Sequence, residues 1–464
     1  MTYNRGMRTL VIALAFLPHL AAADPPPEQP AQKLTLDQVI GKAIANPRVQ
    51  MVLGDRDSAA ARVDEADAAR LPHIKGTMFA TLSPDISCHA YTTAAGVVLD
   101  AKLCVTTEPS NFAFEFTAGI FATAQVDVTQ PLYTFGKIQH ARDAARAGLD
   151  AQRALADEAA GDAASDAARA YWGLKLAREL GAMLDDGIDE IAKAQQDFAE
   201  KKDATIQDRQ RVAVLLAEAK AQRAEAADGE ALALAGLRAV TADDRADIDD
   251  TELAPVDHVI LDEHGIAVAA ERRPQSVAAR AGAHAADELL EYERAQYFPD
   301  IALVGSAAYS YATDVQEPIS AFAYDPYFRQ GAGLGVGVQW TIEPWNTRAR
   351  ADRARAEAHK LHAQSELAAL GARFDAETAR ADATTAHDKL AAAAEGEKAA
   401  RTWLAAVLQN EAIGTAESRD LADAYLAWFQ MRSRWATAVF QWNVAVVRLD
   451  RATGEFRADG VRPR

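Results

Sequence analysis

The stretch LGVGVQWTIEPWN, Leu334–Asn346, decides the fold of this chain. Up to Ile342, large apolar side chains alternate with Gly, Gln and Thr. A period of two predicts a β-strand with one apolar face and one wet face. After Glu343-Pro344 the pattern becomes helical for about 65 to 70 residues, on the order of 100 Å. The stretch therefore joins a membrane-type strand to a helix far longer than a globular domain uses.

The same unit occurs twice in the chain. The junction Glu343-Pro344-Trp345-Asn346 matches Gln130-Pro131-Leu132-Tyr133 (344 − 131 = 213), and Asp420 matches Asp208 at a shift of 212. Further upstream, two proline dipeptides recur at a shift of 227, namely Asn46-Pro47 with Arg273-Pro274 and Leu71-Pro72 with Phe298-Pro299. Such a repetition has to be interpreted before any single element.

The repeat predicts the domain organisation. We expect a signal peptide (1–23), a proline-rich lead-in (24–33), a first repeat (34–240), an acidic linker (241–257), a second repeat (258–454) and a polar C-terminal tail (455–464). Within the first repeat we expect a helix from Leu34 to Ala69 with Thr35 as N-cap, a strand over Ile74–Leu82, a loop over Ser83–Asn111, a strand over Phe112–Val128, and a long helical hairpin after Pro131.

The first residues have the pattern of a secretory signal: Arg5 and Arg8, an apolar run over Leu10–Leu17, and small residues before Asp24. Loss of both arginines changes the formal charge from −18 to about −20. Such an acidic chain repels phosphate backbones, so we expect no nucleic-acid partner. No later stretch approaches the roughly 18 to 20 apolar residues of a spanning helix, so contact with a bilayer requires strands.

The final long helix has a seven-residue apolar seam. Its members are Leu421, Trp428, Trp435, Trp442 and Leu449, interleaved with Tyr425, Val439 and Val446 and broken only by Arg432. A seven-residue period indicates left-handed supercoiling against a partner helix. The tryptophans could form an aromatic ligand track, but this spacing favours packing.

The strand count predicts an oligomer. Each repeat supplies about two membrane-type strands, so one chain supplies four, whereas a barrel in a membrane must close and starts at about eight strands. Two chains give a barrel filled by its side chains, and three give twelve strands and a lumen. The charged helices extend from such a barrel into the periplasm.

These features together resemble the TolC family of outer-membrane efflux proteins over about Leu34 to Gly454. The resemblance rests on the doubled unit, the two strand-to-helix junctions, the turn Ile413-Gly414-Thr415 and the run Asp420-Leu-Ala-Asp423-Ala424. It implies an α+β membrane protein, a trimer whose 12-stranded barrel lies in the outer membrane and whose long coiled-coil hairpins form a periplasmic tunnel. It also implies a passive exit duct for efflux or type I secretion, coupled through a periplasmic adaptor to an inner-membrane pump.

The resemblance assigns roles to residues near the hairpin ends. Asp420 and Asp423, with Asp208 as the first-repeat equivalent, correspond to acidic residues that ring the closed tunnel tip. Asp420 and Asp423 are also i, i+3 on one helix face, where threefold symmetry would gather them; alternatively they are solvated charges at a helix start. The residues expected to contact the adaptor are Lys202, Asp203, Ile413, Gly414 and Thr415. The family's tip tyrosine and arginine are Glu411 and Ala416 here, so a latch of that kind is not expected.

The remaining chemistry is sparse. Cys88 and Cys104 lie close in one loop, which in an oxidising compartment predicts a local disulfide. His359 and His362 are i, i+3 on a helix, but no further ligand pattern accompanies them, so a solvated face is favoured over a metal site. We find no catalytic motif and expect neither an enzyme nor a cofactor. The competing hypothesis is a periplasmic coiled-coil structural or adaptor protein without a membrane barrel.

Overall fold

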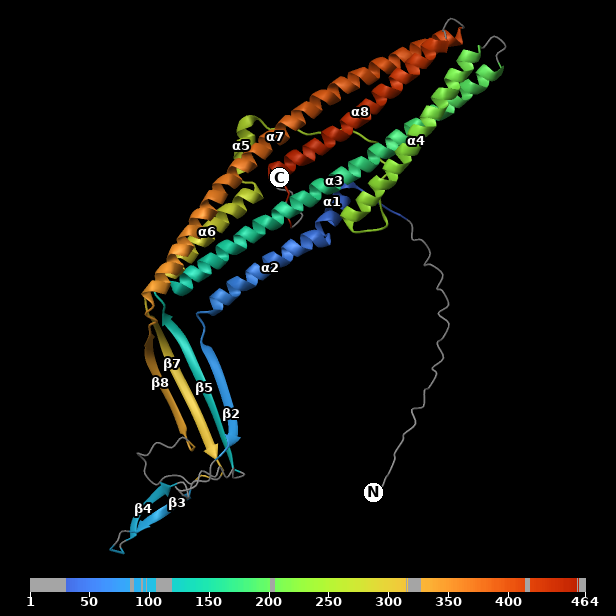
Figure 1. The fold of residues 1–464 in the computed structure, drawn as a ribbon. Coiled ribbons are helices and arrows are strands. Elements are labelled where there is room, and N and C mark those ends of the chain that lie inside the picture. Colours follow the sequence, from blue (N-terminus) through green and yellow to red (C-terminus); the bar gives the residue numbers. More distant parts are fainter. Residues whose placement is uncertain are drawn as a thin grey trace, which may run out of the picture.

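The computed structural model describes residues 31–83, 87–92, 95–96, 98–105, 119–200, 205–313, 315, 327–413, 418–456 and 458. The fold has two parts, a narrow β-sheet at one end and a long helical body (Figure 1). The sheet has four strands in the order β2-β5-β7-β8: β2 (His73–Leu82), β5 (Ile120–Tyr133), β7 (Asp300–Ala312) and β8 (Gln330–Gln339). All three neighbouring pairs are antiparallel. Each repeat therefore contributes two adjacent strands, as the sequence predicts.

The helical body is built from two equivalent sets of helices. The first repeat supplies α1 (Leu36–Ile44), α2 (Pro47–Ala68), α3 (Lys137–Glu200) and α4 (Ile206–Thr241), and the second supplies α5 (Glu263–Glu271), α6 (Pro274–Ala295), α7 (Pro344–Ala412) and α8 (Ser418–Ala452). α3 and α7 have 64 and 69 residues, close to the predicted 65 to 70. Both ends of α1 and α2 recur in α5 and α6 at the shift of 227.

The order of the helices changes along the body. Near the sheet, α3 lies between α2 and α6, bonded through Arg142 to Asp67 and through His140 to Glu288. Toward the far end, α3 contacts α4 and α8 instead. There Glu179 of α3 pairs with Arg432 of α8 at 2.6 Å. α7 contacts α6, α8 and α5 within the chain, so one flank of this long helix has no neighbour among the described residues.

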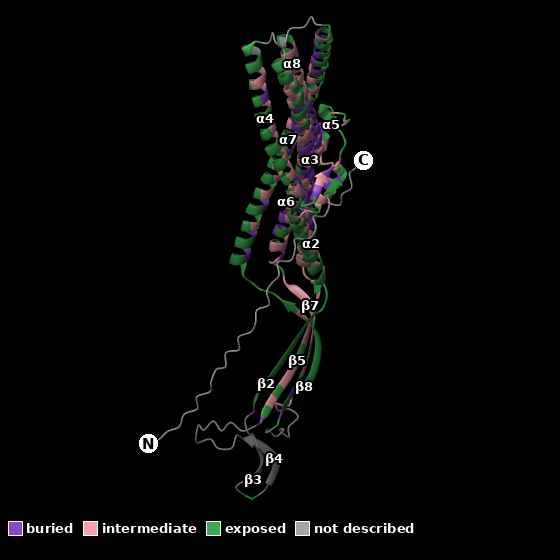
Figure 2. Ribbon diagram, turned by 90° about the vertical axis from the view of Figure 1, so that its right-hand side faces the viewer, coloured by how far each residue is buried: buried purple, intermediate pink, exposed green. Residues whose placement is uncertain are grey.

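The core lies inside the helical body and is made largely of alanine. Figure 2 shows the buried residues gathered among the helices, while the sheet is mostly exposed. The predicted seam of α8 packs as expected: Val439, Trp442 and Leu449 are buried, and Trp428 and Trp435 lie against the core. Arg432, the one break in the seam, lies over the ring of Trp435 at 4.5 Å. Packing is therefore the role of this tryptophan series.

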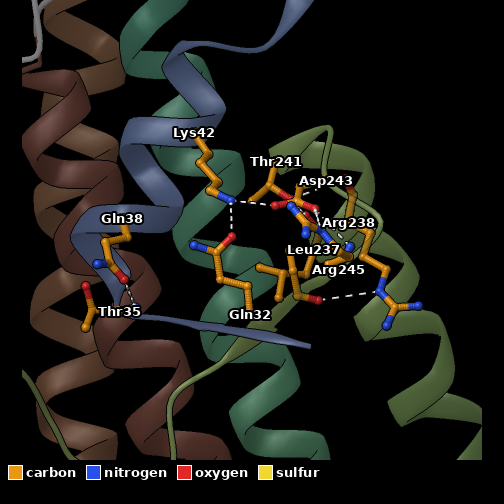
Figure 3. Close-up of polar contacts among 10 residues, drawn as sticks. Gln32, Thr35, Gln38, Lys42, Leu237, Arg238, Thr241, Asp243 and Arg245 are labelled. Atoms are coloured by element: carbon orange, nitrogen blue, oxygen red, sulfur yellow. Dashed lines mark hydrogen bonds and ion pairs between the residues drawn. The ribbon is translucent and has the colours of Figure 1, made fainter. Parts of the chain in front are cut away.

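The segment between the repeats is built into the body. Its strand β6 (Ala246–Ile248) pairs in parallel with β1 (Gln32–Leu34), just before α1. Figure 3 shows Lys42 of α1 bridging Gln32 and Asp243, while the Thr35 N–H donates to Gln38 at the start of α1. Thr35 is the N-cap of α1, as predicted.

Beyond β6, the linker is fixed by α3 and α8. Lys175 is 3% exposed and pairs with Asp249 at 2.8 Å, and Tyr171 donates to the same carboxylate. Burial raises the pKa of Asp249, but the hydrogen bonds from Lys175, Tyr171 and Thr251 outweigh it and hold the pKa below its usual range. Burial and this acidic partner raise the pKa of Tyr171.

Four predictions of local structure were wrong. The helix expected over Leu34–Ala69 is broken into α1 and α2 at Asn46-Pro47, because the residue before a proline leaves the α region. Asn46 then caps α2 by accepting from the Arg48 N–H. The expected loop Ser83–Asn111 contains a hairpin of β3 (Ser87–Thr92) and β4 (Val98–Val105). Apolar Val98 and Leu103 alternate imperfectly there, which hid the strands.

The other two errors concern where strands end. β5 continues through Pro131 to Tyr133, and the helix begins only at Lys137, after Phe135 and Gly136 at positive φ. Pro131 is tolerated because the pairing with β7 shifts register there, where the strand needs no regular amide donor. β8 ends at Gln339, so Trp340 and Ile342 follow the strand. The start of the expected strand over Phe112–Val128 lies outside the described residues.

Candidate functional site

The β-sheet has one face made almost entirely of apolar side chains. Registers place Ile74 beside Val128, Val126 beside Ala307 and Leu303 beside Val336, all on the same side. The large members are exposed in the single chain: Met78 87%, Leu334 75%, Val336 67% and Val338 66%. No carboxylate, Lys or Arg occurs on this face of the described strands. Such a face is stable only against lipid or another apolar surface.

The opposite face is mostly polar or small, apart from Phe79 and Phe121. Lys75 of β2 lies opposite Asp127 of β5, and Thr123 and Ser310 share a hydrogen bond of 3.0 Å between their hydroxyls. β8 contributes only glycines to this face between Gln330 and Gln339. The alternation of an outward apolar band with an inward polar lining is the signature of a membrane-spanning strand.

Aromatic side chains mark both ends of the apolar face. Tyr309 and Tyr311 stand at the end away from the helices, and Trp340, Tyr297 and Phe298 at the helical end, all 40% exposed or more. The Trp340 indole donates to the Tyr297 carbonyl at 3.2 Å. Within the described ranges, no helix is both long and apolar enough to cross a membrane. Aromatic girdles of this kind sit at the two membrane–water interfaces.

The two outer strands of the sheet each have a single neighbour. β2 pairs only with β5, and β8 only with β7, among the described residues. Their free edges present unpaired backbone groups, which are costly in lipid. In a membrane both edges would need further strands to pair with.

The ends of the helical hairpins are the second candidate site. Asp420 lies in the first turn of α8 and Asp423 one turn further, and both are exposed. Asp423 pairs with Arg419 at 3.8 Å. The adjacent face of α8 is packed, since Ala424 is fully buried against Leu404 and Val407 of α7. The two carboxylates thus share the free face of the hairpin, as their spacing predicts.

The remaining tip residues are only partly described. Asp208 is the third residue of α4, as Asp420 is the third of α8, so the predicted equivalence holds for the backbone. Ile413 is 73% exposed just past the end of α7. Lys202, Asp203, Gly414 and Thr415, like Ala416, lie outside the described residues. Their roles in adaptor contact remain predictions.

Comparison with known proteins identifies the architecture. Residues 265–455, the second repeat, match the family model described as outer membrane efflux protein. CusC, a protein that forms a transmembrane channel, superposes with a TM-score of 0.70 at 15% identity over 91% of this chain and 92% of that chain. The outer membrane channel CmeC of Campylobacter jejuni gives 0.69 at 15% over 91% and 86%. MtrE of Neisseria gonorrhoeae gives 0.69 at 17% over 90% and 88%.

The fold is TolC-like. The second repeat carries the outer membrane efflux protein signature, which confirms the predicted resemblance and the α+β fold class and agrees with the expected outer-membrane location. A search among curated proteins found no sequence match.

The other polar candidates lie on α7 and in the β3–β4 hairpin. His362 pairs with Asp287 of α6 at 3.0 Å, and His359 is exposed on α7. No cluster of three potential metal ligands occurs among the described residues. The register of the β3–β4 hairpin places Cys88 directly opposite Cys104. Cα atoms across an antiparallel pair are about 4.5–5.5 Å apart, within the range that a disulfide spans.

Two features of the structure were not predicted from the sequence. One is the completeness of the apolar face, which only the registers of all four strands bring out; alternation in β7 is blurred by Ala and Gly. The other is the ion-pair group around the buried Arg273, at the middle of the helical body. Arg273, 2% exposed, bonds to Asp375 at 2.8 Å and Glu158 at 3.1 Å, and Arg451 bonds to Glu158 at 3.2 Å. No spacing signal links these four positions.

Proposed function

We propose that this chain is the outer-membrane exit duct of an efflux or type I secretion system, assembled as a homotrimer. The single observation that carries the proposal is the two-faced sheet with two free edges, attached to helices long enough to form a periplasmic tunnel. Three copies of a four-stranded sheet give twelve strands, which enclose a lumen, whereas two copies give a barrel that side chains fill.

The polar lining of the sheet supports passive conduction of solutes. Ser, Thr, Gly and one Lys75–Asp127 pair leave the inner face hydrated and close to neutral. The chain offers no nucleotide-binding loop, so energy has to come from an inner-membrane pump, coupled through a periplasmic adaptor at the hairpin tips. The role proposed is transport without catalysis and without a cofactor.

The competing hypothesis, a periplasmic coiled-coil protein, accounts for α3, α4, α7 and α8 alone. It gives no reason for an apolar sheet face exposed over its whole length between two aromatic girdles.

Membrane fractionation tests the proposal directly. The protein is expected to pellet with outer membranes, to resist extraction by high salt and alkali, and to have the mass of three chains by light scattering in detergent. Release by salt would exclude a barrel. A stable monomer in detergent would contradict closure by copies of the chain.

A further inference from the structure

The contacts between the two repeats of one chain predict the contacts between neighbouring copies of the chain. α2 and α6 have the same bounds at a shift of 227 (274 − 47), and β2 and β7 begin at the same shift (300 − 73). Each chain therefore contains two equivalent units side by side. Within the chain, β5 and α3 of the first unit contact β7 and α6 of the second. If the next copy is placed by the same relation, β8 and α7 of one copy contact β2 and α2 of the next.

The strand registers turn this repetition into named pairs. Ile74 lies opposite Val128, and its equivalent Ile301 lies opposite Val338, so β5 corresponds to β8 at a shift of 210 (338 − 128). Within the chain Val128 pairs with Gly305 of β7. Moving Val128 by 210 and Gly305 back by 227 puts Val338 opposite Met78. The same step puts Gly337 opposite Phe79.

The faces of the sheet agree with this register. Val338 and Met78 both belong to the apolar face, whereas Gly337 and Phe79 both belong to the polar face. A register displaced by one residue would put apolar side chains into the lumen. Phe79, the large apolar side chain on the polar face of β2, is 56% exposed in the single chain and would lie over the glycines of β8. An aromatic ring over a cross-strand glycine is a stabilising pair.

The helices give an independent check. In the junction within the chain, α3 packs on α6, and Ala154 of α3 and Ala278 of α6 are 6% and 7% exposed. The helix ends relate α3 to α7 by a shift of 212 (412 − 200) and α2 to α6 by 227, so the equivalent positions fall beside Leu367 on α7 and at Met51 on α2. Leu367 and Met51 are 68% and 73% exposed in the single chain. Large apolar side chains that are exposed where the equivalent helix positions are buried indicate a missing neighbour.

We propose that neighbouring copies join through β8 and α7 of one and β2 and α2 of the next, with Val338 opposite Met78, Gly337 opposite Phe79 and Leu367 packed against Met51. The partner is a second copy of this chain, and the inference rests on the proposed assembly of several copies. It goes beyond that assembly by fixing the register and the contact residues of the seam.

Cysteine cross-linking in the outer membrane tests the register. In a chain carrying Cys88→Ser and Cys104→Ser, the double variant Met78→Cys/Val338→Cys is expected to form a covalent trimer on mild oxidation, reversed by reductant, from most of the protein. The matched control, Met78→Cys/Leu334→Cys, is displaced by four residues, about 13 Å along the strand. That exceeds the Cα separation a disulfide allows. The control is expected to yield less than about a tenth of the product.

A second pair covers the case in which the strand variants fail to assemble. Met51→Cys/Leu367→Cys lies outside the sheet and is expected to join neighbouring chains with a short bismaleimide. The two proposals fail differently. If the unaltered chain is monomeric in detergent, the proposed function fails. If the unaltered chain is trimeric but the control pair cross-links as well as Met78/Val338, or neither Met78/Val338 nor Met51/Leu367 links, the seam is wrong and the duct stands.

Discussion

A charge placed on the apolar face of the sheet is expected to block assembly in the membrane, whereas the same charge one residue away is expected to be tolerated. Val126 is the seventh of the 14 residues of β5, near the middle of the membrane-spanning part. It is 44% exposed and lies between Gly76 and Ala307, with no carboxylate on its face. Gln125 points to the polar face, where its amide donates to Asp127 at 2.8 Å.

The size of the effect follows from the depth of the residue. A lysine at the bilayer midplane on a lipid-facing position costs about 2–4 kcal/mol. Since about 1.4 kcal/mol is a factor of ten, Val126→Lys should lower the equilibrium constant for folding into lipid by roughly 30- to 900-fold in each chain. Gln125→Lys gains Asp127 as a partner and should change it by less than about threefold.

Equilibrium urea titrations in phosphatidylcholine vesicles, with the folded fraction followed by tryptophan fluorescence, measure both variants. If Gln125→Lys is as damaging as Val126→Lys, or if Val126→Lys folds like the unaltered chain, the assignment of the lipid face is refuted.

Three further predictions concern the helical body and the loop. Trp442→Ala should lower the free energy of unfolding by about 3–5 kcal/mol in urea titrations in detergent, since the indole is 3% exposed and donates to the Val256 carbonyl at 2.8 Å; Trp345→Ala, at an 82% exposed site, should leave it unchanged. Because the pKa of Asp249 is lowered in the fold, its contribution is present above the unfolded pKa of about 3.9 and lost as pH falls through the folded pKa. Asp249→Asn should therefore lower the melting temperature at pH 7, and this loss should shrink as the pH falls below about 3.9; a loss that does not change with pH would refute the ionisation of Asp249 in the fold. Peptide mass spectrometry without reduction should find Cys88 bonded to Cys104, and free thiols at both would refute the pairing.

The sequence predicted the repeat and the class of elements because these depend on regular patterns. Pro47 and Pro274 mark the starts of equivalent helices, and the seven-residue seam through Trp442 marks the buried side of α8. Alternation around Val336 and Val126 predicted the strands and their apolar face. Local sequence could not predict that Pro131 lies within β5. A proline ends a regular β-ladder, but it is accommodated here because the register of the pairing with β7 shifts.

Features that depend on distant contacts were beyond the sequence. The pairing of β1 with β6 joins residues more than two hundred positions apart, and neither three-residue strand has a period to detect. From its position in the sequence, Arg273 resembles an ordinary surface residue at a helix start. In the fold it is buried and pairs with one carboxylate of α3 and one of α7. Of the predicted tip residues, the shared face of Asp420 and Asp423 followed from helical spacing alone. Their position relative to a pore axis depends on neighbouring copies.

Single-channel recording with the purified protein in planar bilayers tests the central claim most directly. The account predicts discrete, cation-selective current steps from the unaltered chain or, if its tip is shut, from the double variant Asp420→Ala/Asp423→Ala, with higher conductance or weaker cation preference in the variant. Conductance and selectivity that are the same in both would remove these two residues from the constriction. Silence from both proteins, in bilayers where a known porin conducts, would contradict a duct and favour the periplasmic coiled-coil protein.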